Sequence, residues 1–311
     1  LFRRVGDDAP EALTRDNADY TAGREMPRQE AFRWSGPDGR QVEGLLFIPP
    51  ESAGGGPRPC VVGLHGGPAE SVRFGPGKDT DYATVLASRG FLVFRPNYRG
   101  STGYGDEVYR DIVGRYFNHM PGDVLSGVEA LVEQGLADPD RLAVMGYSAG
   151  GALTKKLVTM TDRFRAASAG AGASCWWTMY ALGDLRVTRD HWFGGPPRFE
   201  DGDPGIWWDA SPMRDVAKAK TPMLLFYGEE DRRNPWFEGA LFHRALQDNG
   251  IECRLFLAPG QGHGDWKKSF HLAKANLEIE FFERLLNGRE YDFEPAPGAG
   301  GADRQEGDRS P

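Results

Sequence analysis

A short apolar run, a glycine-flanked serine and an amphipathic stretch follow one another between residues 141 and 160. Residues 141–145 are typical of a buried strand, and residues 152–160 have the apolar spacing of a helix. Between them lies Gly146-Tyr-Ser-Ala-Gly150, a Gly-x-Ser-x-Gly pentapeptide. A strand, this turn and a helix form a nucleophile elbow, because the glycines permit a turn too sharp for Cβ atoms. The stretch therefore predicts an exposed Ser148 hydroxyl in front of a helix N-terminus that favours an oxyanion.

The pentapeptide alone is a weak signal. The chain has 42 glycines among 311 residues, and chance supplies roughly 0.2 copies of the pattern in such a composition. An ordinary serine in a glycine-rich turn is therefore the alternative interpretation, and the rest of the chain has to decide between the two.

Strand-like and helix-like stretches alternate along most of the chain. We expect strands at residues 30–34, 42–48, 59–64, 90–94, 141–145, 164–168, 222–227 and 252–257. We expect helices at residues 81–88, 122–134, 152–160, 237–248 and 270–286. The turn residues at 35–39 join the first two strands as a hairpin. This alternation predicts an α/β fold with a mostly parallel central sheet and helices on both faces.

Composition divides the chain into three parts. Residues 1–30 are polar and without periodicity, and we interpret them as a lead-in segment. Residues 31–290 carry the alternation and form the expected catalytic domain. Residues 291–311 are rich in glycine and charge and are expected to be disordered. An aromatic-rich break in the alternation, at residues 174–215, either packs beneath a long loop or supplies an apolar wall for a substrate side chain. The tryptophans concerned are Trp176, Trp177 and Trp207.

Charge and cysteine content exclude several classes of protein. The formal charge is -8, which argues against a nucleic-acid or anionic-membrane partner, because both need a concentrated positive surface. No apolar run reaches 18 residues, so no membrane span is expected, and the start of the chain lacks the apolar core of a signal peptide. The three cysteines are far apart and predict neither a metal site nor a disulfide framework. We expect a reducing, cytoplasmic location; because the chain begins with Leu1, an export signal lost with a missing part stays an alternative.

A serine nucleophile needs a base, and on this kind of fold the chain order is serine, then acid, then histidine. Three histidines follow the strand expected at 222–227. His243 and His271 fall within expected helices, whereas His263 lies in a glycine-flanked loop directly after a strand. Because catalytic groups gather in loops at the ends of parallel strands, we predict that His263 is the base for Ser148.

The sequence leaves more than one candidate for the triad acid and for the oxyanion-hole donors. Glu229, Glu230 and Asp231 all follow the strand expected at 222–227, and a short, stiff Asp231 suits an orienting role, although position alone leaves the glutamates open. The backbone N–H of Ala149, next to the nucleophile, is one expected oxyanion donor. The second should come from Leu64-His-Gly-Gly-Pro68, which has the His-Gly-Gly form of esterase and lipase oxyanion loops.

A family resemblance extends from about residue 30 to residue 288. The segments that carry it are His65-Gly-Gly-Pro68, Asn97-Tyr-Arg-Gly-Ser-Thr-Gly-Tyr-Gly105, Gly146-Tyr-Ser-Ala-Gly-Gly151, Trp192-Phe-Gly-Gly-Pro196, Ser211-Pro212, Gly228-Glu-Glu-Asp-Arg-Arg-Asn-Pro235 and Gly262-His-Gly264. With these segments the chain resembles the prolyl oligopeptidase family of serine peptidases, most closely its acylaminoacyl-peptidase-like branch. The resemblance implies an α/β-hydrolase fold and a serine peptidase that hydrolyses oligopeptides as an acylaminoacyl peptidase or aminopeptidase, without a cofactor or metal. A carboxylesterase or acyl-transfer enzyme with the same triad is the alternative, and a non-catalytic binding domain is a third interpretation.

The resemblance also implies individual roles. The family's acid stands two residues before an arginine and four before a proline, which favours Asp231 over the glutamates. By the same matching, Arg233 holds a substrate backbone carbonyl or carboxylate, and Gly67 is the second oxyanion donor. The chain departs from the family pattern in having Ala149 for the usual tyrosine and Asn234 for the usual valine.

The largest departure concerns the start of the chain. Members of the family carry an N-terminal β-propeller of several hundred residues, and here only about 30 polar residues precede the catalytic domain. The resemblance therefore implies a catalytic-domain fragment whose β-propeller partner is absent. It also implies possible assembly as a homo-oligomer through the hydrolase domain.

Overall fold

The structure is a computed structural model that describes residues 22–75, 82–197 and 205–291, together with residues 2–3, 11–12, 14 and 18. The tail expected to be disordered lies outside the described residues from position 292 on, as does much of the lead-in segment. Near the N-terminus, β1 (Phe2–Arg3) and β2 (Glu11–Ala12) form an antiparallel pair. Within the described part of the chain, no helix has the length and apolarity needed to cross a membrane.

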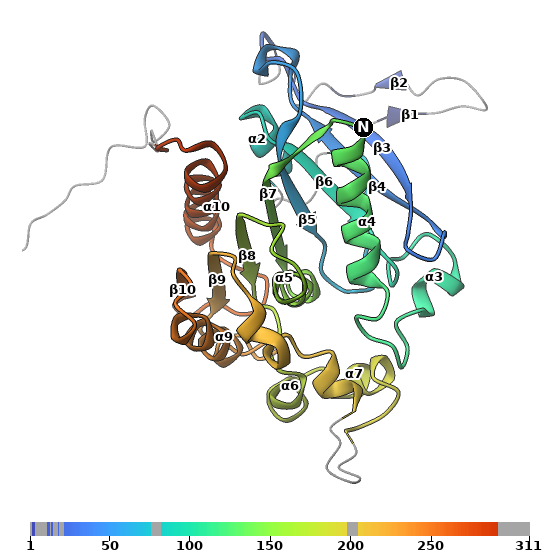
Figure 1. The fold of residues 1–311 in the computed structure, drawn as a ribbon, viewed down its shortest axis with the longest axis vertical. Helices are drawn as coiled ribbons and strands as arrows, with labels where there is room; N and C mark the ends of the chain where they lie inside the picture. Colours follow the sequence, from blue (N-terminus) through green and yellow to red (C-terminus); the bar gives the residue numbers. More distant parts are fainter. Residues whose placement is uncertain are drawn as a thin grey trace, which may run out of the picture.

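A mixed sheet runs through the middle of the molecule (Figure 1). Its eight described strands are β3 (Arg28–Ser35), β4 (Gln41–Ile48), β5 (Arg58–Leu64), β6 (Leu92–Asn97), β7 (Ala137–Tyr147), β8 (Ala166–Gly170), β9 (Met223–Gly228) and β10 (Cys253–Ala258). Their order across the sheet is β10-β9-β8-β7-β5-β6-β4-β3. Strand β4 is antiparallel to both of its neighbours, β3 and β6, and all other neighbouring strands are parallel. The predicted mostly parallel sheet and the predicted hairpin are therefore confirmed.

Helices cover both faces of this sheet, as expected from the alternation. The longer ones are α4 (Met120–Glu133), α5 (Ala149–Met160), α9 (Phe237–Asp248) and α10 (Lys268–Phe282). Buried residues of α4, α5 and α9 join one hydrophobic cluster, and those of α10 and of α2 (Ala83–Ser88) join a second cluster on the opposite face. Alternate residues along each strand belong to one cluster or the other, because successive side chains of a strand point to opposite faces of the sheet.

Short helical turns fill the stretches that the alternation left unassigned. The aromatic-rich break folds as α6 (Trp176–Leu182), α7 (Arg186–Trp192), α8 (Ile206–Asp209) and the 3₁₀-helix η3 (Pro212–Lys218). Sequence reasoning also missed α3 (Asp106–Arg110) and the 3₁₀ turn η1 (Glu51–Ala53). The last helix ends earlier than expected and continues as a π-helical turn, η4 (Glu283–Asn287).

The winding of the chain reverses beside β5. After β5 the chain adds β6 on one side, and then returns to add β7 on the other side of β5. Loops that leave the carboxyl ends of two such strands diverge, and ligands bind in the crevice between them. The His65 loop follows β5 and Ser148 follows β7, so both predicted functional segments lie at this position.

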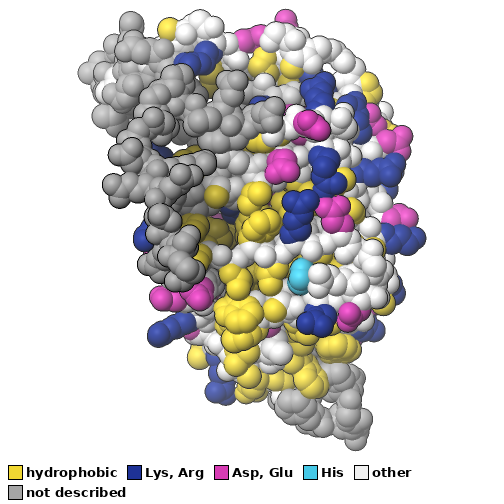
Figure 2. Space-filling view, turned by 90° about the vertical axis from the view of Figure 1, so that its left-hand side faces the viewer, with side chains coloured by type: hydrophobic (Ala, Val, Ile, Leu, Met, Phe, Trp, Pro, Cys, Tyr) yellow, Lys and Arg dark blue, Asp and Glu magenta, His cyan; other side chains and the backbone are white. Residues whose placement is uncertain are grey.

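The edge strand β10 lies on one side of the molecule together with α9 and α10 (Figure 1). Figure 2 shows that face, with hydrophobic side chains gathered over its lower half and charged side chains around them. Phe237, Leu257 and Leu272 are exposed hydrophobic residues of α9, β10 and α10. An unpaired strand edge with exposed apolar residues is a place where another chain can pair.

Candidate active site

The turn between β7 and α5 has the strained form of a nucleophile elbow. Ser148 has φ 59° and ψ -120°, a conformation that a residue with a side chain rarely adopts. A Cβ atom on Gly146 would lie 2.5 Å from the backbone of Gly150, and one on Gly150 would lie 2.3 Å from the carbonyl oxygen of Leu64. Only glycine fits at either position, which is the physical requirement inferred from the pentapeptide.

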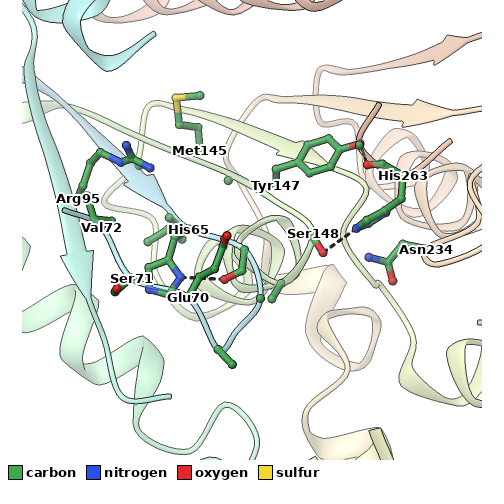
Figure 3. A pocket seen from close by; sticks show the side chains of 18 of the residues that line it. His65, Glu70, Ser71, Val72, Arg95, Met145, Tyr147, Ser148, Asn234 and His263 are labelled. Carbon is green, nitrogen blue, oxygen red and sulfur yellow. Dashed lines mark hydrogen bonds between the residues drawn. The ribbon is translucent and has the colours of Figure 1, made fainter. Parts of the chain in front are cut away.

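Ser148, His263 and Asp231 lie in one hydrogen-bonded chain. Figure 3 shows the part of it between Ser148 and His263. The Ser148 Oγ is 2.9 Å from His263 Nε2, and His263 Nδ1 is 2.8 Å from Asp231 Oδ2. The other oxygen of Asp231 accepts the backbone N–H groups of Arg233 and Asn234, both at 2.9 Å. Asp231 is buried, and its two oxygens are therefore held in fixed directions by the loop backbone.

The glutamates that competed with Asp231 face elsewhere. Glu229 and Glu230 are exposed, and Glu229 Oε2 accepts the backbone N–H of Gly260 at 3.0 Å. The structure thus brings Asp231 to His263, which sequence position alone left open. His243, by contrast, is hydrogen-bonded to the carbonyl of Cys253, away from Ser148.

Two aromatic residues fix the loop that carries His263. The hydroxyl of Tyr147 donates to the carbonyl oxygen of His263 at 2.6 Å, and Trp266 Nε1 donates to the carbonyl of Gly262 at 2.9 Å. Burial raises the pKa of Tyr147, which keeps this hydroxyl a donor. Sequence reasoning missed both residues; the position of Tyr147 inside the pentapeptide, next to Ser148, was the signal available for it.

Contacts with the Asn97–Gly105 segment fix the loop after β5. The ring of Tyr98 stacks on His65 with centroids 4.3 Å apart, and its hydroxyl donates to the His65 carbonyl at 2.6 Å. Ser101 Oγ lies 2.8 Å from His65 Nε2. His65 is buried and acts as part of this support, while Gly67 and Ala149 line the same cavity as Ser148.

That cavity has a volume of about 1290 Å³, which is enough for several residues of a peptide. Of the three predicted tryptophans, Trp176 lines it, whereas Trp177 and Trp207 lie outside its described lining. A role for Trp177 and Trp207 as substrate contacts stays a prediction. Trp207 is turned inward, where it stacks on Phe193 at 4.2 Å, and Trp177 packs edge-on against Trp208.

Arg233 stands at the rim of the cavity. Its guanidinium is half-exposed and lies 3.2 Å from the Asp184 carboxylate. A partly solvated arginine in a weak surface ion pair can exchange that partner for a substrate oxygen at small cost. Among the described residues, no group of three or more His, Cys, Asp or Glu side chains is arranged to hold a metal ion.

The mostly parallel sheet, the strained serine turn after β7 and the histidine loop after β10 define an α/β-hydrolase fold. A sequence model of the prolyl oligopeptidase family matches residues 79–289. The chain belongs to that family.

Individual relatives agree with this membership. The chain is 32% identical over 252 residues to the uncharacterized peptidase YuxL of Bacillus subtilis, covering 81% of this chain and 38% of the relative. It is 31% identical to the human acylamino-acid-releasing enzyme, covering 76% of this chain and 32% of that enzyme. The solved acylaminoacyl peptidase of Pyrococcus horikoshii superposes with a TM-score of 0.81 at 27% identity, covering 92% of this chain and 46% of that one. The chain thus spans less than half the length of each of these relatives.

Proposed function

We propose that this chain is the catalytic part of a serine peptidase that uses Ser148, His263 and Asp231 as its triad. The observation that carries the proposal is the unbroken hydrogen-bond chain from Ser148 Oγ through both nitrogens of His263 to a buried carboxylate. Such an arrangement suits removal of the serine proton by the imidazole as the hydroxyl attacks a carbonyl carbon.

The reaction follows from the geometry. Ser148 Oγ attacks the scissile carbonyl carbon while its proton moves to His263 Nε2, and Asp231 stabilises the imidazolium that forms. The tetrahedral intermediate collapses as His263 gives the proton to the leaving amine, which departs and leaves an acyl-serine. Water, deprotonated by the same histidine, then releases the acid and regenerates Ser148.

The carbonyl oxygen becomes an oxyanion during both steps. Backbone N–H groups of Ala149, at the first turn of α5, and of Gly67 are our proposed donors, and both residues line the cavity beside Ser148. We assign Arg233 to a substrate backbone carbonyl or carboxylate farther from the scissile bond. We propose peptides with an acylated or free N-terminus as the substrate class, and the name of the human relative, an acylamino-acid-releasing enzyme, supports the acylated form.

The test compares Ser148→Ala with Ser88→Ala, which removes an exposed hydroxyl on α2. We expect Ser148→Ala to lower kcat for an acyl-peptide anilide by about 10⁴-fold or more and to abolish labelling by a fluorophosphonate, while Ser88→Ala behaves as wild type. Hydrolysis of p-nitrophenyl esters without any hydrolysis of anilides would favour the carboxylesterase or acyl-transfer alternative. Failure of the fluorophosphonate to label the wild type would favour a non-catalytic binding domain.

Three broader expectations belong to the same proposal. We propose that a β-propeller limits the size of substrates in the whole protein, which the greater length of the relatives supports. We also propose self-association through the β10 edge, supported by its exposed apolar residues. A cytoplasmic location is supported by three buried cysteines that are all unpaired.

A further inference from the structure

One wall of the cavity is built by the short helices after β8 and by the loop before α4. Tyr116, Trp176, Arg189 and Trp192 line it, and Asn234 connects it to the triad. Asn234 donates its backbone N–H to Asp231 and accepts a hydrogen bond from Arg189 Nη2 at 3.1 Å. Figure 3 shows Asn234 beside Ser148 and His263. This wall is therefore next to the position where the scissile carbonyl must lie.

Arg189 is a buried cation in that wall, with 2% of its surface exposed. Within the described part of the chain, its hydrogen bonds go to neutral oxygens, namely the carbonyls of Met179 and Arg233 and the side chain of Asn234. No carboxylate of the described residues forms an ion pair with it, although buried arginines are normally paired. Burial lowers the pKa of Arg189, but an arginine remains charged at neutral pH.

Polar atoms without partners concentrate in the same wall. Arg189 Nε, Trp176 Nε1 and the hydroxyl of Tyr116 are buried and have no hydrogen-bond partner among the described residues. All three residues line the cavity, and Tyr116 packs edge-on against Trp176 with centroids 5.1 Å apart. Buried donors are almost always satisfied, so three unsatisfied ones in this wall need an acceptor that the described residues do not supply.

Asn234 adds to the polarity of this wall. Its amide oxygen accepts a hydrogen bond from Arg189 Nη2 and so orients the guanidinium. Arg233, at the rim, already has the Asp184 carboxylate 3.2 Å from its guanidinium. Arg189 is therefore the cation of this wall that still lacks an anion among the described residues.

We propose that this wall is a specificity subsite for an acidic side chain, so that the enzyme prefers substrates with glutamate or aspartate at the residue whose carbonyl Ser148 attacks. The inference rests on the proposed peptidase function. The carboxylate would pair with Arg189 and accept from Trp176 and Tyr116, whose rings enclose the aliphatic part of the side chain. A charged hydrogen-bonded pair in such a buried site discriminates strongly against the neutral amide of the same shape.

The test uses two anilide substrates that differ only in charge, N-acetyl-Ala-Glu-p-nitroanilide and N-acetyl-Ala-Gln-p-nitroanilide. We expect kcat/KM of the wild type to be about tenfold or more higher for the glutamate substrate. Arg189→Met should remove this ratio, and Arg189→Lys should retain part of it. Tyr116→Phe, which deletes a hydroxyl without a partner, should lower the ratio about threefold and leave folding intact. Arg186→Met, an exposed arginine on the same helix, should leave it unchanged.

A wild-type ratio of one or less would overturn the subsite while leaving the peptidase proposal intact, provided that the glutamine substrate is cleaved. A ratio unchanged in Arg189→Met, or equal losses on both substrates, would reduce Arg189 to a structural role. Binding of the two substrates to Ser148→Ala, measured by calorimetry, decides the subsite independently of turnover. If no substrate is cleaved and no fluorophosphonate labels Ser148, the proposed function fails, but tighter binding of the glutamate peptide would still support the subsite.

Discussion

Replacing Asp231 with asparagine tests the triad through the direction of hydrogen bonds. In the native site Oδ1 accepts two backbone N–H groups, from Arg233 and Asn234, and Oδ2 faces His263 Nδ1. An asparagine that keeps its oxygen on the two N–H groups must turn its NH₂ toward His263. Because that NH₂ is a donor, Nδ1 must become the acceptor, and the proton moves to Nε2. The histidine then cannot take the proton of Ser148.

The size of the effect follows from the cost of the opposite amide orientation. Turning the amide over would restore the correct tautomer but would leave two buried N–H groups facing an NH₂ group. Each lost hydrogen bond costs about 1–3 kcal/mol, so the productive orientation is populated at roughly 3% or less. We therefore expect kcat to fall at least about 30-fold and, if the orientation is fully locked, about 10⁴-fold, equivalent to about 5 kcal/mol of activation free energy.

The assay is steady-state hydrolysis of an acyl-peptide anilide at pH 7, with thermal unfolding to verify that the variant is folded. Glu230→Gln is the matched control, because it neutralises an exposed carboxylate in the same loop, and we expect it to stay within twofold of wild type. If Asp231→Asn kept kcat within tenfold of wild type while folded, the orientation argument and the assignment of Asp231 would both be refuted.

Two further predictions concern buried charges away from Ser148. Asp123→Ala removes the buried ion-pair partner of Arg99 and should lower the free energy of unfolding, measured by urea denaturation, by about 3–5 kcal/mol. Asp38→Ala removes the half-exposed partner of Arg99 and should lower it by less than about 1 kcal/mol. Burial lowers the pKa of Lys155 to about 7, so above pH 7 the native state sheds a proton that the unfolded state keeps. Wild type should therefore gain about 2 kcal/mol of stability relative to Lys155→Met between pH 7 and pH 9, and a flat difference across that range would contradict the prediction.

The predicted sheet and its longer helices match the structure to within a few residues, because their hydrophobic periods are long and regular. The expected helix at 237–248 coincides with α9, and the hairpin around residues 35–39 has the register that its turn residues require. Residues 174–215 have no regular hydrophobic periodicity, and their helices were not predicted. These short helices are held by aromatic contacts between residues far apart in the chain, such as Tyr116 with Trp192 at 5.5 Å, which local patterns do not encode.

The candidate site divides in the same way. The glycines at 146 and 150 predicted a turn in which no side chain fits. The chain order of serine, acid and histidine, together with the loop position of His263, selected His263 as the base among the histidines. Position alone did not separate Asp231 from its neighbouring glutamates, because the choice depends on which side chain the loop backbone turns inward. Trp177 and Trp207 resembled Trp176 in sequence, but only Trp176 lines the described cavity.

By itself, the sequence determined the class of fold and the chemistry near Ser148, since both depend on residue types at fixed local spacing. Only the tertiary structure decided how the cavity is lined. Arg189, Asn234 and Tyr116 lie on three separate segments, and no local spacing relates them to one another. They form a polar wall because the tertiary fold brings Arg189 of α7 within hydrogen-bonding distance of Asn234 and leaves its buried guanidinium without an ion pair among the described residues. Burial and the pairing of charges are properties of that packing, which no local sequence pattern records.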